Sequence, residues 1–479
     1  MNVDYKKTKA EIGAILDSDD ILYREFKINE TEAGLIYLDA LSDKLLLEQD
    51  IVRPLLDLTI LEPTFEFLTA KLKYGEKIKT EVSFEKAAAA IASGDIVLAI
   101  DNATEFFILS IKKYNHRAVQ EPPTETVLKG PREGFIEDIK VNLSLLRRKL
   151  KTPKLRIKNF YVGKYSDTTV CLAYIDGIAD NETVNKIADK IKAIDIDGII
   201  GAAYIERFVE EHKFSLFNQA GVTEKPDIVM GKLLEGRIAI LVDGSPIVLT
   251  VPYLLFEGFQ DSYDYYCRDS RGSMLRLLRI VGAIFSVMLP GLYVAIQEYH
   301  YHLLPLKFLI SVLNAIKGIP FTPPMEMLFV LILFEILHQA SVRMPRYVGT
   351  ALSVVGAIVL GETAVNAGLL SSPAVLIIAI SAIGINCVPD LVDAFSILRV
   401  AVLLIGSVLG LFGIIIFTVM VIAYLCSLDS YGTPYLAPFA PSIPSDMKDS
   451  IIKDNLINMK KRPFSISTDN RRRLRDDDK

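Results

Sequence analysis

Hydrophobic and polar residues follow different patterns in the two parts of this chain. Before about residue 270, short apolar runs rich in β-branched residues alternate with stretches in which apolar residues recur at helical spacing. These patterns are typical of strands and of amphipathic helices. Beyond that point the apolar runs are long enough to cross a bilayer. The chain is therefore predicted to be α/β (α+β) first and an all-α, multi-spanning transmembrane domain afterwards.

Two stretches of the N-terminal part resemble each other. Residues 37–43, YLDALSD, are similar to residues 174–180, YIDGIAD, and residues 94–101, GDIVLAID, are similar to residues 236–243, GRIAILVD. The offsets of 137 and 142 residues agree within five, and the pairs occur in the same order. One pair alone could be chance, but two in order favour a duplication. We expect two related subdomains.

The second copy gives the clearest elements. Ile238 to Val242 and Ile247 to Val251 are β-rich runs on either side of Asp243-Gly244, a turn dipeptide that accepts positive φ, so they predict a hairpin. Apolar residues recur at helical spacing after Asp180 or Asn181, either of which can cap a helix. Each module is expected to run strand, strand, helix, helix, strand, strand.

A Pro-containing linker separates the copies, and residues 135–150 after it have a helical pattern. This helix either braces the two modules or docks another subunit. The predicted domains are residues 1–120 (first subdomain), 121–150 (linker and helix), 151–270 (second subdomain), 271–428 (four to six transmembrane spans) and 429–479 (cytoplasmic C-terminal tail).

Charge supports this division. Between Ile280 and Leu428 only 11 of 149 residues are Asp, Glu, Lys or Arg, whereas the other 330 residues carry 100 of the 111 such residues. The net charge of -5 provides no concentrated basic face, so no nucleic-acid partner is expected. The acidic first 20 residues lack a signal-peptide pattern, which places the N-terminal part in the cytoplasm.

Individual spans follow from uncharged runs. Residues 280–297 and 400–428 contain no charge, and residues 347–389 contain one, enough for two crossings. Residues 325–340 are a further, shorter candidate, and residues 303–319 either lie along the membrane surface or cross as a short helix. Basic residues before the first span and in the tail place both ends in the cytoplasm, which requires an even number of spans.

Ionisable residues inside these runs are candidate functional groups, because each is costly at membrane depth. Glu362, near the middle of an apolar stretch, is either a pore-lining or ion-relay carboxylate or a packed, hydrogen-bonded residue. Glu335 and His338 share a helix face, which allows a proton relay or a structural hydrogen bond. These three are the candidate pore or coupling residues.

Other charged residues are interpreted as structural or as marking the membrane edge. Glu326 lies in the first turn after two prolines, where a carboxylate complements the helix dipole. Asp390 and Asp393 follow a proline at an edge or a re-entrant break. Arg343 and Arg346 are the remaining edge residues, and they fit four spans more easily than six.

No catalytic or metal motif was found. The patterns GxxxxGKS/T, HExxH and GxSxG are missing, and the four cysteines form no CxxC pair and have no nearby histidine at ligand spacing. We therefore expect no enzymatic activity, no cofactor and no metal site.

Several segments in order resemble the A subunits of GerA-type spore germinant receptors. They are Asp264-Tyr265-Tyr266, Pro290-Gly291-Leu292-Tyr293-Val294-Ala295, Phe334-Glu335-Ile336-Leu337, Val342-Arg343-Met344-Pro345-Arg346, Ala367-Gly368-Leu369, Val388-Pro389 and Pro434-Tyr435-Leu436. The resemblance covers most of the chain from about Phe135 onward. His338-Gln339 depart from the basic-acidic pair expected there, which argues against an ion-pair role at that place.

The resemblance implies a receptor complex in the spore inner membrane, with a multi-spanning B subunit and a lipid-anchored C subunit. In such a complex the A subunit contacts membrane lipid, forms a homo-oligomer, and couples germinant sensing to germination, with an oligomeric cation-release channel as one form of coupling. Two alternatives are a transporter that itself binds a small solute and a non-conducting assembly scaffold. A transporter would show inverted repeats or paired broken helices, and no convincing pair is found.

Overall fold

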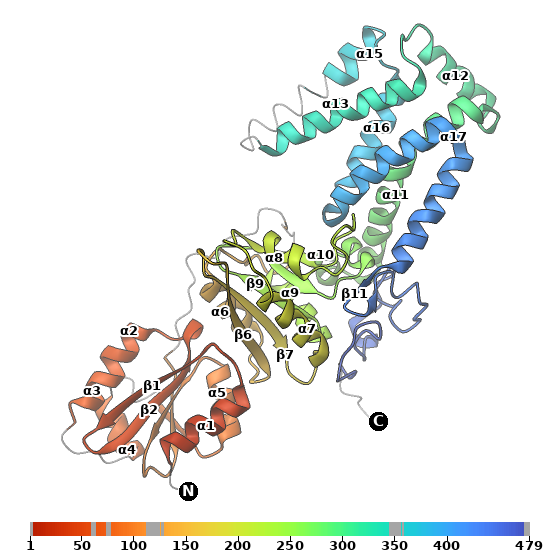
Figure 1. The fold of residues 1–479 in the computed structure, drawn as a ribbon. Coiled ribbons are helices and arrows are strands. Elements are labelled where there is room, and N and C mark those ends of the chain that lie inside the picture. The colour runs from red at the N-terminus through yellow and green to blue at the C-terminus, as the bar shows by residue number, and fades with distance from the viewer. Residues whose placement is uncertain are drawn as a thin grey trace. The chain divides into compact units, whose positions relative to one another are not determined.

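The computed structural model describes residues 3–58, 64–72, 78–111, 125, 129–343, 356 and 359–473 (Figure 1). It divides into two compact units. The sheet unit contains Met1–Lys213, Gln219–Tyr253 and Leu456–Lys479, and the helical unit contains Phe214–Asn218 and Leu254–Asn455.

The first half of the sheet unit is a five-stranded sheet with helices packed on it. The strands are β1 (Ile21–Ile28), β2 (Thr31–Leu38), β3 (Ile78–Glu81), β4 (Ile96–Ile100) and β5 (Phe106–Leu109). The helices are α1 (Tyr5–Leu16), α2 (Lys44–Leu47), α3 (Arg53–Leu56), α4 (Phe65–Lys71) and α5 (Phe84–Ala92). Every residue of β4 and β5 is buried, as the apolar runs predict for central strands.

The second half repeats this arrangement. Its strands are β6 (Leu155–Val162), β7 (Thr168–Ile175), β8 (Gly221–Thr223), β9 (Ile238–Val242) and β10 (Val248–Val251). Its helices are α6 (Ile139–Lys149), α7 (Asn181–Lys192), α8 (Ala202–Val209) and α9 (Pro226–Glu235).

Both sheets have the same strand order and are antiparallel throughout. The first runs β1-β2-β4-β5-β3 and the second β6-β7-β9-β10-β8. The duplicated α/β (α+β) fold is therefore confirmed. The predicted module lacked one element, because β3 and β8 are additional edge strands of four and three residues. Runs this short carry too little periodicity to be recognised.

Local predictions in the second half are confirmed. β9 and β10 pair in an antiparallel hairpin, with Leu241 opposite Val248. The cap of α7 is Asp180 rather than Asn181, and its carboxylate accepts the backbone N–H of Thr183 at 3.0 Å. The helix expected from residue 135 begins later, at Ile139, because Asp138 caps it.

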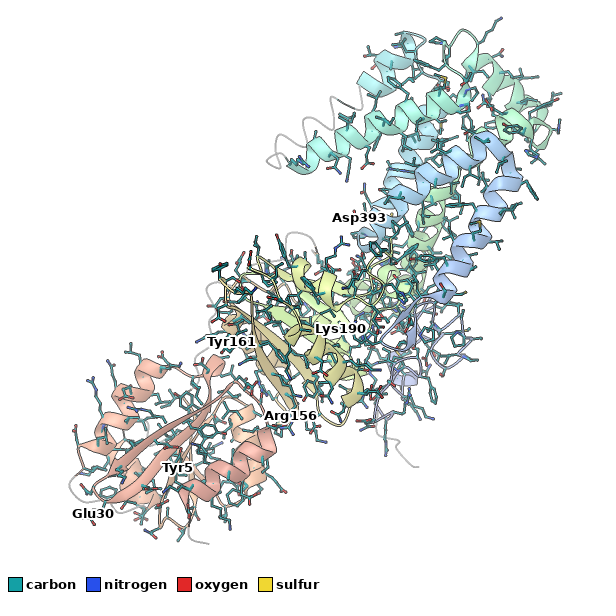
Figure 2. All side chains as sticks on the ribbon, in the orientation of Figure 1. Tyr5, Glu30, Arg156, Tyr161, Lys190 and Asp393 are labelled. Atoms are coloured by element: carbon teal, nitrogen blue, oxygen red, sulfur yellow. The ribbon has the colours of Figure 1, made fainter. Side chains whose placement is uncertain are left out.

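Helix α6 ties the two halves of the sheet unit together, so bracing is the role that the structure gives it. Arg147 on α6 donates from Nη2 to Asp20 Oδ1 at 2.8 Å and from Nε to Asp20 Oδ2 at 3.0 Å. The two side chains are 1% and 4% exposed. Arg156 on β6, labelled in Figure 2, adds a bond to the carbonyl oxygen of Ile15 at 2.8 Å.

The helical unit contains most of the apolar sequence. Its elements are α10 (Ser262–Tyr266), α11 (Asp269–Tyr299), α12 (Leu306–Ile316), α13 (Pro323–Arg343), α15 (Ala364–Asn366), α16 (Ser372–Ile385), α17 (Val392–Ser427), β11 (Asp429–Ser430) and β12 (Thr433–Pro434).

Three helices in the described part of the chain are long and apolar enough to cross a membrane. They are Asp269–Tyr299, Pro323–Ala340 and Pro389–Ser427, while Leu306–Ile316 and Ser372–Ile385 are shorter apolar helices. The multi-spanning helical domain is thus supported, whereas the number of four to six spans stays a prediction.

Helix α17 is broken at Gly410, where φ is 61° and ψ is -153° (Figure 1). The break separates residues 392–409 from residues 411–427, each about 25 Å long at 1.5 Å per residue. The hydroxyl of Tyr299, at the end of α11, donates to the carbonyl oxygens of Ser407 at 2.9 Å and Val408 at 3.2 Å. These carbonyls lie just before the break, where helical partners are lost.

Glycines allow the long helices to approach closely. A Cβ on Gly406 of α17 would lie 2.8 Å from the carbonyl oxygen of Gly291 on α11, and a Cβ on Gly384 of α16 would lie closer still to the carbonyl oxygen of Gly282 on α11. Small residues at helix contacts of this kind are typical of membrane bundles. Helix α11 is thus the common packing partner of α16 and α17.

Candidate functional site

A buried arginine joins three helices of the helical unit. Arg399, in the first segment of α17, is 4% exposed and donates from Nη2 to Oε2 of Glu335 on α13 at 3.2 Å. Its Nη1 lies 3.4 Å from Oγ of Ser381 on α16. This pair lies within helices apolar enough to span a membrane.

A fourth helix completes the group. Ser381 Oγ donates to the carbonyl oxygen of Ser286 on α11 at 2.6 Å, and both serines are fully buried. We call Ser286, Glu335, Ser381 and Arg399 the Arg399 cluster. Arg399 Nε and Ser286 Oγ are buried without a hydrogen-bond partner among the described residues. The cluster therefore retains unused hydrogen-bonding capacity in the interior of the bundle.

Glu326 is buried rather than placed at an edge. It is 1% exposed, and its Oε1 accepts the backbone N–H of Ser371, the N-cap residue of α16. The carboxylate thus complements the dipole of its own helix, as expected. It also complements the dipole of α16, whose N-cap residue Ser371 lies 45 residues further along the chain.

A second ionic cluster lies at the start of α11. Asp264 and Arg276 are both fully buried, and Arg276 Nε donates to Asp264 Oδ2 at 3.0 Å. Arg279 Nη2 donates to Asp264 Oδ1 at 2.6 Å. Arg276 Nη1 reaches Asp449 Oδ1 at 2.8 Å, and Tyr265 OH donates to Asp449 Oδ2 at 2.9 Å. We call these five residues the Asp264 cluster.

The Asp264 cluster places two distant parts of the chain together. Asp449 follows the last apolar helix, and Arg276 is near the beginning of the first one. Both ends of the helical domain therefore lie on one side of the bundle. The Asp264-Tyr265-Tyr266 segment, which carried part of the family resemblance, supplies the central carboxylate.

The other predicted pore residues are less enclosed. Glu362 is exposed in the helical turn Val359–Thr363. His338 is half-buried, and no hydrogen bond links it to Glu335 within the described chain. The structure instead pairs Glu335 with Arg399. The predicted relay partner is thus replaced by a residue 64 positions away.

The predicted edge residues lie near helix ends. Asp390 lies in the short helical turn Pro389–Leu391 before α17, and Asp393 is exposed in the first turn of α17 (Figure 2). Arg343 is exposed at the C-terminal end of α13. Arg346 lies outside the described residues.

Sequence reasoning missed Arg399 as a functional residue, because it used this charge only to delimit an apolar run. Ser286 and Ser381 gave no signal at all. Arg399 lies six residues after Asp393 within one helical pattern. This was the available sign that the helix begins before Arg399. Within the described residues, no group of three or more His, Cys, Asp or Glu side chains could hold a metal ion.

Comparisons with known proteins agree over nearly the whole chain. The model of the family described as Bacillus/Clostridium GerA spore germination protein matches residues 7–465. Spore germination protein KA of Bacillus subtilis (strain 168) is 35% identical over 473 residues, covering 97% of this chain and 86% of that protein. Spore germination protein GerLA of Bacillus cereus is 33% identical over 473 residues, covering 97% and 95%.

One solved structure is also similar. It is the crystal structure of the N-terminal domain of the A subunit of the Bacillus megaterium spore germinant receptor GerK3, with 29% sequence identity and a TM-score of 0.41. The match covers 52% of this chain and 93% of that one.

Proposed function

Because the chain belongs to the GerA family of spore germination proteins and so has a role in spore germination, we propose that it is the A subunit of a nutrient germinant receptor. In this proposal it is a non-enzymatic protein of the spore inner membrane. Its sheet unit lies in the cytoplasm and its helical unit in the lipid. It couples germinant sensing to the release of monovalent cations.

The observation that carries this proposal is the Arg399 cluster. An ion pair and two serines connect α11, α13, α16 and α17, helices whose other residues are mostly apolar. Charged groups at membrane depth cost roughly 2.5 to 3.5 kcal/mol each on insertion scales, so they are rare where only packing is needed. Polar groups shared among several helices are suited to line or control an ion path.

In this proposal, assembly of several copies of the chain completes an ion path. Several copies of the chain, arranged as a homo-oligomer, would surround a polar route, with Glu335 and Glu362 facing it. The B and C subunits would bind this chain, and chiefly the B subunit would recognise the nutrient. Germinant sensing is then coupled to cation release by a change in the conformation of the helical unit, which the assembled complex imposes.

Reconstitution tests this function directly. The purified complex of A, B and C subunits is placed in potassium-loaded liposomes, and efflux is recorded before and after adding amino acids, sugars or nucleosides. Germinant-dependent efflux is the expected result. Assembly without any efflux would favour the scaffold, and uptake of labelled nutrient by the isolated chain would favour the transporter.

A substitution at Glu362 tests the proposal at the level of a single residue. Replacing Glu362 with Gln should slow potassium release during germination, because a neutral amide attracts a passing cation less strongly. Asp393→Asn, at an exposed position in the first turn of α17, is the matched control and should behave as the wild type. Unchanged release from Glu362→Gln spores would remove this residue from the path.

A further inference from the structure

The two members of the Arg399–Glu335 pair differ in exposure. The arginine side chain is 4% exposed and the glutamate side chain 42% exposed. A half-exposed carboxylate on a membrane helix is costly against hydrocarbon, so it faces water or another protein surface. Glu335 is therefore accessible from outside its own bundle, whereas Arg399 approaches it from the inside.

The guanidinium of Arg399 is held loosely. It makes one bond to the carboxylate at 3.2 Å and one contact to Ser381 at 3.4 Å, while its Nε has no partner among the described residues. Arg276 is a useful comparison, because it is also buried and has one unpartnered nitrogen, Nη2, yet its Nε and Nη1 make four hydrogen bonds of 2.8 to 3.1 Å. Bidentate arginine–carboxylate pairs are stronger and better oriented than a single bond.

An alternative acceptor lies beside the pair. Ser286 Oγ is fully buried and has no hydrogen-bond partner in the described part of the chain. Ser381, which Arg399 already contacts, donates to the carbonyl of this same serine. A guanidinium that leaves Glu335 can thus remain hydrogen-bonded by turning toward the two serines.

We propose that Arg399 is a tethered cation that occupies the Glu335 site in the closed receptor, and that a monovalent cation replaces it when the receptor opens. This regulation rests on the proposed channel function. The displaced guanidinium stays on the two serines, so a monovalent ion at the carboxylate adds one positive charge to the cluster and a divalent ion adds two. The exchange therefore suits potassium or sodium better than a divalent ion in a low-dielectric site.

The test uses the full receptor complex in potassium-loaded liposomes without germinant. Arg399→Gln removes the tethered charge but keeps an amide of polar character, and it should raise resting efflux at least about tenfold over the wild type. Arg399→Gln combined with Glu335→Gln removes the cation site as well and should bring efflux back down. Arg343→Gln, an exposed arginine at the end of α13, is the matched control.

The outcomes separate the two proposals. A wild-type complex that never conducts with germinant overturns the channel function itself. If the wild type conducts and the Arg399→Gln complex stays closed at rest, only the proposed exchange of Arg399 at Glu335 is overturned. Equal leakage from the single and double variants also overturns it, because Glu335 would then not be the site that Arg399 blocks.

Ser286→Ala provides a second measurement should Arg399→Gln fail to assemble. Without this acceptor, the guanidinium keeps only Ser381 as a partner when it leaves the carboxylate, so germinant-triggered efflux should slow several-fold. Efflux at the wild-type rate would contradict the proposed movement of Arg399.

Discussion

Individual buried charges in this protein serve different purposes according to how completely they are paired. Arg147 and Asp20 form two short bonds in a nearly inaccessible place between the two sheets. Arg399 makes only a single, longer bond to its carboxylate, at 3.2 Å. The first arrangement fixes a geometry, and the second leaves a group that is able to change partners.

Removing one partner of the fixed pair should be strongly destabilising. Asp20→Asn leaves the charge of Arg147 buried without a counter-ion, which we expect to cost about 3 to 5 kcal/mol. Hydrogen exchange of the slowest amides in β1 and α6 of the detergent-solubilised protein measures this loss. Lys140→Gln is the control, since Lys140 is 64% exposed where it meets Asp39 and should change stability by less than about 1 kcal/mol.

Cysteine reactivity gives a second test at this scale. Burial raises the pKa of the Cys171 thiol to about 12, so at pH 8 roughly one molecule in ten thousand carries the reactive thiolate. Iodoacetamide should therefore modify the exposed Cys387 and Cys426 and spare Cys171. Mass spectrometry of the peptides, with urea-unfolded protein as reference, measures this. Modification of Cys171 at the rate of Cys426 would contradict its burial.

Sequence reasoning at this scale succeeded where the partner is close along the chain. The cap of α7 could be predicted because Asp180 and Thr183 are three residues apart. Arg399 and Glu335 are separated by 64 residues and meet only after four helices have packed. No local pattern contains that information, which is why Glu335 was paired with His338 instead.

Helix α17 shows that prediction from local sequence has the same limit for whole elements. Its composition predicted an uninterrupted span over residues 400–428, but the chain bends at Gly410, in a backbone region that is almost exclusive to glycine. Leucines flank this glycine, so the polar or proline residues that usually mark a break are missing. The break depends on α11, whose last residues contact it.

Substituting this glycine should destabilise the helical unit. In Gly410→Ala the new Cβ would meet Tyr299 and His300 at 3.2 Å and would strain the backbone, at a cost of about 1 to 3 kcal/mol. Thermal unfolding followed by circular dichroism in detergent measures the effect. The matched control is Gly231→Ala inside α9, where nothing lies within 4 Å of the added atom. It should be neutral or stabilising by up to about 1 kcal/mol.

At the scale of the whole molecule, the Asp264 cluster determines on which side the chain enters and leaves the helical domain. Arg276 and Asp449 can touch only if both lie on the same side of the bilayer. This contact therefore predicts an even number of crossings between the two residues, as does the distribution of basic residues along the sequence.

Cysteine labelling in oriented membrane vesicles tests this topology. Cys267, Cys387 and Cys426 are first replaced by Ser, and single cysteines are introduced at the exposed positions Ser270, His302 and Ser445. An impermeant maleimide should label Ser270→Cys and Ser445→Cys from one side and His302→Cys from the other. Labelling of Ser270→Cys and Ser445→Cys from opposite sides would show that the contact between Arg276 and Asp449 does not form in the membrane.

Much of the overall architecture could be predicted, because its signals repeat or extend over many residues. The duplication left two matching segments in order, and the family resemblance, carried by segments such as Asp264-Tyr265-Tyr266, is confirmed by a match over residues 7–465. The arrangement of the helices could not be predicted, since contacts such as Arg276 to Asp449 join residues 173 positions apart.

The return of the C-terminal segment has a genetic consequence. A nonsense mutation just after Leu428 would leave every apolar helix encoded, yet Arg276 would lose Asp449, and the carbonyl of Leu234 would lose the 2.6 Å bond from Arg462 Nε. Both main parts of the shortened product would thus be damaged at once. Late frameshifts in this gene are therefore expected to behave as null alleles rather than as mild ones.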